Sequence, residues 1–389
     1  MAVYLDNNAT TRTDPSVVQA MLPFLTEQFG NASSAHGFGR QVAGAMRQAR
    51  SSVQALLGAA YDDEIVFTSG GTESNNAAIL SALSTQEGRD EIVTTSVEHQ
   101  AILALVEQLA KSGVKVHLIA VDSRGRLDLE AFRSALGPRT AIASVMWANN
   151  ETGTIFPVEH LAAWTRACGA LFHTDAVQAV GKVSIDLKAS EIDMLSMSGH
   201  KLHGPKGIGA LYLRKGTTFR PLIWGGTQER QRRGGTENVP GIVGLGKAAE
   251  LAAERLERAR VRVAALRDRL ERSILQSGHC EILGDPSDRL PNTTNIAFEG
   301  LDGEAILHHL NRAGIAVSLG SACSSGAMEP SHVLRALQVP AGSLHGAVRF
   351  SLSHETTAEE IDQVVRALSD ILARLRGMSR ELANPASNP

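Results

Sequence analysis

The stretch Met194-Leu195-Ser196-Met197-Ser198-Gly199-His200-Lys201 places a lysine directly after a short apolar run. The run Met194–Met197 predicts a buried strand, because it is short, apolar and closed by polar and glycine residues. A lysine at the end of such a strand is poorly solvated, and burial favours the neutral amine that attacks a carbonyl carbon. For a single lysine the ordinary alternative, an exposed residue in a turn, is far more common. A reactive lysine at position 201 is therefore indicated only if other residues of the same site support it.

Runs of the same kind recur along the first two thirds of the chain. Further strands are predicted at Glu64–Thr68, Glu91–Thr95, Lys115–Ala120, Ala141–Trp147, Leu171–Thr174 and Ile208–Leu213. Amphipathic helical stretches lie between most of them, for instance Gln100–Ser112 and Glu159–Cys168. This alternation predicts an α/β domain with a largely parallel, buried sheet between helices.

The chain changes character at Leu251–Leu275, which is dense in Glu and Arg and predicts one long helix. Shorter elements follow and predict a smaller α+β domain: Thr294–Phe298, Glu304–Ala313, Ala347–Leu352 and Ala358–Leu375. A chain of 389 residues is too long for one typical core. We expect a large domain formed by residues 15–255 and a small domain formed by residues 1–14 and 256–389. The tail Asn384–Pro389 is expected to fray.

The composition excludes several classes of protein. A net charge of −3 and an aromatic content of 4% offer no attraction to phosphate backbones, so we expect neither nucleic acid nor a membrane as partner. No apolar run is long enough to span a bilayer, and the first residues do not resemble a secretory signal. The cysteines, Cys168, Cys280 and Cys323, are widely spaced. This spacing favours reduced thiols in the cytoplasm and argues against a zinc or four-cysteine iron–sulfur site.

Two polar residues follow the strand predicted at Leu171–Thr174. Asp175 could pair with a protonated ring nitrogen of an aromatic cofactor. Gln178 is three residues further, so on an opening helical turn it would face the same way and could donate to a ring oxygen. The ordinary alternative for Asp175 is a helix N-cap.

A glycine turn, Ser69-Gly70-Gly71-Thr72, follows the strand Glu64–Thr68 and opens a helix. Free amides at a helix N-terminus bind phosphate, and glycine lets the backbone approach it closely. A structural turn with a capping threonine is the alternative. The sequence contains neither a nucleotide P-loop nor a dinucleotide-binding fingerprint at this point.

His99 and the pair Asn149-Asn150 follow two more of the predicted strands. An imidazole at position 99 could stack on a cofactor ring or shuttle a proton, although a satisfied histidine at a helix start is the better explanation of His99 alone. Asn150 could form a turn or reach a cofactor oxygen. All five segments lie at the carboxyl ends of predicted strands, where open α/β sheets bind ligands. Their joint pattern is therefore more specific than any single member.

At these residues the chain resembles fold-type I pyridoxal-phosphate enzymes of the aminotransferase class V group, and specifically cysteine desulfurases. The resemblance runs from Leu5 to about Arg376. Its motifs include Glu64-Ile65-Val66-Phe67-Thr68-Ser69-Gly70-Gly71-Thr72-Glu73-Ser74-Asn75, His173-Thr174-Asp175-Ala176-Val177-Gln178, Arg233-Gly234-Gly235-Thr236-Glu237-Asn238 and Gly320-Ser321-Ala322-Cys323.

The resemblance implies roles for individual residues. Lys201 holds pyridoxal 5′-phosphate covalently, Asp175 pairs with its ring nitrogen, and His99 stacks on the ring as a further catalytic residue. The other residues implied to bind the cofactor are Gly71, Thr72, Asn150, Gln178, Ser198 and His200, with Thr236 contributed by the neighbouring subunit of a homodimer. The substrate, L-cysteine, is implied to meet Asn8, Asn150 and Arg349, whose planar fork would clamp the carboxylate.

Cys323 lies in the small, polar stretch Ser318–Gly326, which predicts an accessible loop. The ordinary alternative is an incidental small residue in a loop, but an exposed free cysteine is costly to keep and indicates a reactive thiol. The resemblance makes it the catalytic thiol that attacks the substrate sulfur, which leaves L-alanine and a persulfide on Cys323. The persulfide is implied to pass its sulfur to an iron–sulfur scaffold protein, and to make Cys323 a transient iron–sulfur ligand.

Within the family the chain is most similar to the nitrogen-fixation branch, whose product feeds nitrogenase metallocluster assembly. The short tail and the stretch Val145–Asn150 support this branch. Gly234 departs from the serine or alanine that relatives more often carry. Other interpretations stay open: a selenocysteine lyase or class V aminotransferase of the same fold, or a non-enzymatic sulfur carrier or scaffold, against which the scattered cysteines argue.

Overall fold

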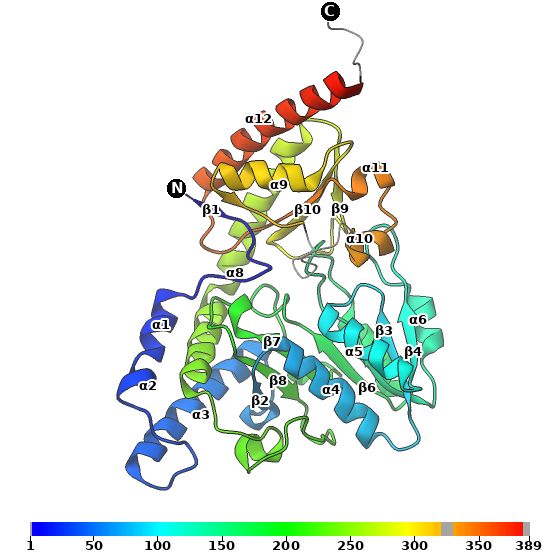
Figure 1. Cartoon of the computed structure of the whole chain (residues 1–389). Helices are drawn as coiled ribbons and strands as arrows, with labels where there is room; N and C mark the ends of the chain where they lie inside the picture. Colours follow the sequence, from blue (N-terminus) through cyan, green and yellow to red (C-terminus); the bar gives the residue numbers. More distant parts are fainter. Residues whose placement is uncertain (1, 320–329, 384–389) are drawn as a thin grey trace, which may run out of the picture.

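The computed structural model describes residues 2–319 and 330–383, with side chains up to residue 377 (Figure 1). Its largest sheet has seven strands in the order β2 (Ile65–Thr68), β8 (Gly209–Leu213), β7 (Met194–Ser198), β6 (Leu171–Asp175), β5 (Thr140–Ser144), β3 (Glu91–Thr95) and β4 (Lys115–Ile119). Strand β8 runs antiparallel to β2 and β7, and the other neighbouring pairs are parallel. The expected α/β fold with a largely parallel sheet is confirmed.

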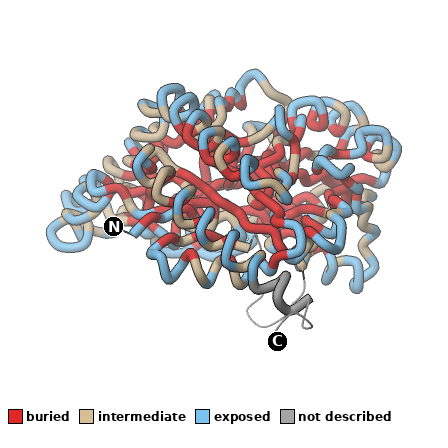
Figure 2. The backbone as a smooth tube through the Cα atoms, turned by 90° about the horizontal axis from the view of Figure 1, so that it is seen from above, coloured by how far each residue is buried: buried red, intermediate tan, exposed pale blue. Residues whose placement is uncertain are grey.

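Helices cover both faces of this sheet, because side chains alternate between the faces along each strand. On β2, Phe67 belongs to a core cluster that also contains residues of α3 (Gly37–Leu57) and α7 (Val158–Ala167). Val66 belongs to a second cluster, with residues of α4 (Gly71–Thr85) and α5 (Gln100–Lys111). Figure 2 shows the result, with buried strands inside and the most exposed backbone on the outer helices.

A second core lies beside the first and contains the beginning and the end of the described chain. Its strands are β1 (Val3–Tyr4), β9 (Cys280–Leu283), β10 (Thr293–Phe298), β11 (Ile315–Ala316) and β12 (Ala347–Ser351). Its helices are α9 (Gly303–Arg312) and α12 (Ala358–Ala383). Helices α10 (His332–Ala336) and α11 (Ala341–Leu344) contribute to a small separate cluster with Leu283 and Ala297, and Val333 of α10 belongs to the large core. Helix α8 (Val239–Leu275) connects the two, because its first turns pack in the large core and its last turns in the second (Figure 1). The domain limits at residues 14/15 and 255/256 stay a prediction.

The remaining elements are short. They are α1 (Pro15–Met21), α2 (Pro23–Thr26), α6 (Leu129–Ala135) and the 3-10 helices η1 (Asp62–Glu64), η2 (Leu187–Ala189), η3 (Gly199–Lys201) and η4 (Gln228–Gln231). Among the helices of the described residues, none combines the length and the apolar character that crossing a bilayer requires.

Three predicted boundaries were wrong. The helix expected to end at Leu375 continues to Ala383 as α12. The strand expected to reach Trp147 ends at Ser144, because the backbone amide of Met146 donates to the side chain of Glu98 (2.9 Å) instead of continuing the ladder with β3. The long helix expected from Leu251 begins at Val239. Its first turns look like helix breakers in the sequence. However, proline is tolerated there, and Gly246 lets α3 approach so closely that a Cβ would lie 2.4 Å from the Cα of Ala49. The tail from Asn384 lies outside the described residues.

The register of β8 brings two strand ends together. Gly209 pairs with Thr68 of β2 on one side and with Ser198 of β7 on the other. A side chain at position 209 would clash, since its Cβ would lie 2.7 Å from the Cα of Gly70. The glycine turn after β2 and the turn that carries Lys201 are therefore neighbours in space.

A buried ion pair between Arg50 and Glu229 connects several segments near this edge of the sheet. Arg50 of α3 donates to both carboxylate oxygens of Glu229 (2.7 and 2.6 Å), and each residue is 7% exposed. The same carboxylate accepts the backbone amide of Phe67 (2.9 Å), while Arg50 also donates to the carbonyl of Ile65 (2.5 Å). The pair thus ties α3, β2 and the segment before residue 233 into one unit.

We expect Arg50→Met to lower the free energy of unfolding by about 3–5 kcal/mol, because it leaves the Glu229 carboxylate buried without a counter-charge. The double variant Arg50→Met/Glu229→Gln keeps an acceptor for the Phe67 amide but carries no charge, so it should lose less than half as much. Denaturant unfolding followed by circular dichroism measures both. A double variant as unstable as the single one would contradict this account.

Candidate active site

A cavity of about 790 Å³ opens where the carboxyl ends of β2, β3, β5, β6 and β7 face the second core. Its volume is in the range of sites that enclose small molecules. The predicted site residues on its wall are Asn8, Gly71, Thr72, His99, Asn150, Asp175, Gln178, Ser198, His200, Lys201 and Arg349. Thr236 is exposed and does not line the cavity of its own chain, and Cys323 lies outside the described residues.

Lys201 ends the 3-10 turn η3 that follows β7. Its Nζ donates to the backbone carbonyls of Asn8 (2.5 Å) and Ala9 (2.7 Å), both in the segment of residues 6–14. The same segment fixes the turn itself, because the amide of Thr11 donates to the carbonyl of His200 (3.0 Å). Lys201 is thus held between the end of a central strand and the beginning of the chain.

Asp175 is the last residue of β6 and is 6% exposed. Its Oδ1 accepts the backbone amide of Val177 (3.0 Å), and its Oδ2 accepts the side-chain amide of Asn75 (2.7 Å). A turn follows instead of the expected helical turn, so Asp175 caps a turn and presents a fixed carboxylate to the cavity.

The glycine turn and η3 line one corner of the cavity, called here the anion corner because backbone amides at a helix start can bind an anion. Gly70, the residue before α4, has no side chain that could cap the first backbone amides of the helix. Gly71 sits so close to Val177 that a Cβ would lie 2.7 Å from its Cγ2. Ser198 and His200 complete this corner of the wall. Burial, and then the charge of Lys201, lower the pKa of His200 to about 4, so its imidazole is neutral at pH 7.

His99 is the N-cap of α5, and its Nδ1 accepts the backbone amide of Ala101 (3.1 Å). The ordinary explanation of this histidine therefore holds, yet its ring is also open to the cavity. Enclosure by the protein lowers the pKa of His99, an effect that the nearby Asp175 partly opposes. Because Nδ1 is engaged as an acceptor, Nε2 carries the ring proton in the neutral form.

Arg349 comes from β12 of the second core and is 2% exposed. One end of its guanidinium donates to Oδ1 of Asp6 (2.7 Å) and the other to the backbone carbonyl of Asn150 (3.0 Å). The Asn8 side chain connects the loop of Asn150 with β10, since its Nδ2 donates to the carbonyl of Asn150 (3.1 Å) and to Oγ1 of Thr293 (2.8 Å). The guanidinium is thus held by a carboxylate and a backbone carbonyl where the second core meets the cavity.

Three residues of the wall, Asn75, Glu151 and His332, and one residue behind it, Asp6, were not predicted. Asn75 orients Asp175, Asp6 pairs with Arg349, and Glu151 and His332 close the side towards α10. Burial raises the pKa of Glu151. Only Asn75 left a usable signal in the sequence, as a polar residue one turn into α4 from Gly71. The other contacts join residues that are distant in the chain.

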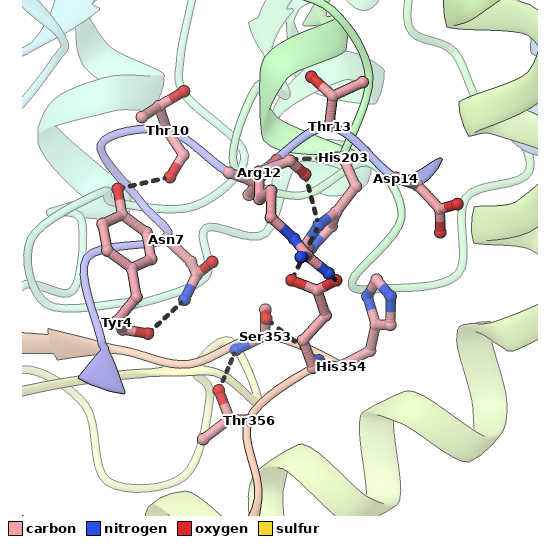
Figure 3. Close-up of polar contacts among 12 residues, drawn as sticks. Tyr4, Asn7, Thr10, Arg12, Thr13, Asp14, His203, Ser353, His354 and Thr356 are labelled. Carbon is pink, nitrogen blue, oxygen red and sulfur yellow. Dashed lines mark hydrogen bonds and ion pairs between the residues drawn. The ribbon is translucent and has the colours of Figure 1, made fainter. Parts of the chain in front are cut away.

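The segment of residues 6–14 continues into a second set of polar contacts (Figure 3). His203 donates from Nδ1 to the carbonyl of Arg12 (3.0 Å), and its ring lies edge-on to that of His354, with centroids 4.3 Å apart. With Glu355, these histidines form a group with metal-ligand chemistry among the described residues. However, Arg12 already pairs with Glu355 (2.6 Å), and Arg255 donates to His354 Nε2 (3.0 Å). These contacts connect the beginning of the chain with the residues that follow Lys201.

Comparisons with known proteins show the family of this chain. The family described as aminotransferase class-V matches residues 3–364. A cysteine desulfurase of Bradyrhizobium diazoefficiens is 75% identical over 378 residues, which cover 97% of this chain and 96% of that relative. Cysteine desulfurase NifS of Azotobacter vinelandii is 60% identical, covering 97% of this chain and 94% of that relative. Among solved structures, a NifS-like protein is 40% identical, with a TM-score of 0.91, and the match covers 96% of this chain and 100% of that one. The chain therefore belongs to the aminotransferase class-V family and, within it, to the cysteine desulfurases.

Proposed function

We propose that the protein converts L-cysteine to L-alanine with pyridoxal 5′-phosphate as cofactor and transfers the sulfur to its own Cys323. The observation that carries this proposal is that Lys201 and Asp175, from neighbouring strand ends, face one cavity that also holds an anion corner and Arg349. A carbonyl-reactive amine, a buried carboxylate, an anion site and a carboxylate clamp are the groups that this chemistry requires.

The cavity fits the cofactor. Asp175, oriented by Asn75 and Val177, would hold the protonated ring nitrogen, and Gln178 and Asn150 would face the ring oxygen. The phosphate would lie against Gly71, Thr72, Ser198 and His200, where the first amides of α4 are not capped by a side chain. His99 would stack on the ring. When bound, the cofactor supplies an electron sink for the charge that develops at the substrate α-carbon.

The chain's own residues provide binding and proton transfer. Arg349 clamps the carboxylate of cysteine with its guanidinium. The same guanidinium keeps its hydrogen bonds to Asp6 and to the backbone of Asn150. Asn8 holds the wall beside the clamp. Lys201 takes the α-proton at Nζ from a position fixed by the end of β7. His99 is the second group at the ring that can hold or release a proton.

Sulfur transfer is assigned to Cys323 on the sequence alone, since this residue lies outside the described part of the chain. Its thiolate attacks the substrate sulfur, the carbon–sulfur bond breaks, and alanine leaves after protonation. One thiol and one cysteine thus yield one persulfide and one alanine, with no added oxidant. The described cysteines do not line the cavity: Cys168 donates to the carbonyl of Thr165 (3.1 Å), and burial raises the pKa of Cys280.

The assembly is proposed to be a homodimer. Thr236 is exposed in a glycine-rich segment, so a neighbouring subunit could receive it at the phosphate corner. Large apolar side chains are exposed as well, among them Leu25 (61%), Phe29 (73%), Phe38 (56%) and Trp224 (69%). Of these, Phe29 and Phe38 stack with ring centroids 5.7 Å apart, and exposed apolar side chains that lie together favour an interface.

The cellular role is proposed from the 60% identity to NifS. The acceptor of the persulfide sulfur would be an iron–sulfur scaffold protein in nitrogenase cluster assembly, in the cytoplasm. Contact with that scaffold would make Cys323 a transient iron–sulfur ligand through its persulfide.

We expect Arg349→Lys to raise the KM for cysteine by about tenfold or more, because an ammonium group cannot form the bidentate contact. The absorption spectrum of the bound cofactor should change little. Steady-state kinetics and spectra measure the two effects. Arg269→Lys, on the exposed face of α8, is the matched control and should behave like the wild type. An unchanged KM in Arg349→Lys would assign carboxylate binding to another cation.

Mixing two inactive chains should restore activity if Thr236 completes the partner's site. Lys201→Ala removes the reactive amine, and Thr236→Asp places a carboxylate against the phosphate. In a hybrid dimer one of the two sites combines an intact Lys201 with an intact Thr236. A 1:1 mixture that exchanges subunits freely should reach about one quarter of wild-type activity. Complete inactivity of verified hybrids, or full activity of Thr236→Asp alone, would refute the shared site.

Cys323→Ser should bind the cofactor and the substrate but release no alanine, because a hydroxyl cannot accept sulfur as a persulfide. Cys168→Ser and Cys280→Ser are matched controls and should stay active. Mass spectrometry of wild type treated with cysteine should show one added sulfur on the peptide containing Cys323, removable by a thiol reductant. Wild-type alanine production by Cys323→Ser would replace transfer by simple elimination and favour a lyase.

A further inference from the structure

Lys182 is a largely enclosed lysine that the proposed reaction does not use. It lies in the turns after β6, and its Nζ donates to Oε1 of Gln178 (2.8 Å). It also lines a second cavity of about 80 Å³, which reaches Lys201 from the junction of the two cores. Burial, followed by the charges of Lys201 and Arg349, lowers the pKa of Lys182 to about 7. Enclosing an amine beside two cations is unfavourable, so an apolar side chain would be the simpler filler.

The hydrogen bonds of Gln178 explain why an amine, and not an apolar group, occupies the position of Lys182. On one side Gln178 accepts from Lys182, and on the other its Nε2 donates to the backbone carbonyl of Asn8 (3.0 Å). The carbonyl oxygen of Asn8 can only accept, so it requires the nitrogen end of the amide, and in its charged form Lys182 can only donate. A flipped amide would therefore oppose two oxygens at Asn8 and two sets of donors at Lys182. The neighbours fix which end of the amide is nitrogen and which is oxygen.

This orientation has a consequence for the large cavity, whose wall includes Gln178. With Oε1 engaged by Lys182 and one N–H engaged by Asn8, the second N–H of Nε2 is left for an acceptor in the cavity. The carbonyl of Asn8 also accepts from Lys201 Nζ (2.5 Å). A chain of hydrogen bonds thus connects Lys182 through Gln178 and Asn8 to the reactive lysine.

We propose that Lys182 is a positioning residue that fixes the Gln178 amide with its N–H towards the ring oxygen of the cofactor. The proposal rests on the proposed function, because it takes pyridoxal 5′-phosphate as the occupant of the cavity. Lys182 itself touches neither cofactor nor substrate, and it acts through one side chain. Its effect should therefore disappear when Gln178 is removed.

The experiment compares Lys182→Met, which keeps the length of the side chain but has no donor, with Lys182→Arg, which keeps a donor. Lys188→Met, on the exposed 3-10 helix η2, is the matched control. Each apoprotein is titrated with pyridoxal 5′-phosphate, and the absorption spectrum of the bound form is recorded. We expect Lys182→Met to weaken binding by roughly 5- to 10-fold, about the worth of one hydrogen bond, and to shift the absorption maximum. Lys182→Arg should restore both towards the wild type.

A double-mutant cycle tests the route of the effect. Lys182→Met/Gln178→Ala should bind the cofactor no more weakly than Gln178→Ala alone, because the two residues act as one unit. If Lys182→Met does not fold, Gln178→Glu replaces it. That variant keeps the acceptor for Lys182 but lacks the N–H, and it should also weaken binding and shift the spectrum.

A wild-type spectrum and affinity in Lys182→Met, or in Gln178→Glu where that variant is used, would overturn the inference, and so would additive effects in the cycle. Failure of the proposed function itself would look different, since the wild-type protein would then bind no pyridoxal 5′-phosphate at all.

Discussion

The contact of residues 6–14 with the turn that carries Lys201 is the interaction on which the rest of the site depends. The carbonyls of Asn8 and Ala9 hold the amine of Lys201, and Thr11 holds the backbone of His200. This segment directly follows β1 and Leu5, which pack in the second core, yet it reaches across to the end of β7. The same stretch carries Asp6, the partner of Arg349. One short segment therefore sets the relative position of a proton acceptor from one core and a carboxylate clamp from the other.

Charge balance is the second constraint. Lys201, Lys182 and Arg349 gather near one another, which is unfavourable in an enclosed site and is expressed in the lowered pKa of Lys182. Asp175 and Asp6 offset part of this charge. The excess of cationic groups suits a phosphate-bearing cofactor and a substrate with a carboxylate, because both bring negative charge into a low-dielectric space.

The accuracy of the sequence-based fold follows from how local the signals are. Strands such as β3 and β7 are short apolar runs bounded by polar residues, and their positions could be predicted within about a residue. The end of β5 could not, because a side chain from another segment, Glu98, takes the place of the ladder partner. The start of α8 was missed because its glycines, which permit close packing against α3, look locally like helix breakers.

The residue types at the strand ends could be predicted from local patterns, since Lys201, Asp175, His99 and the glycine turn each follow a recognisable strand. The packing of the two cores was needed to show that Arg349 of β12 contacts Asp6 and Asn150, and that Lys182 donates to Gln178. The difference lies in the range of the contacts. Strand periodicity and capping act between neighbours, whereas the Arg349–Asp6 pair spans 343 positions and follows from the packing of two cores. No local pattern records which distant partner a buried polar group will find.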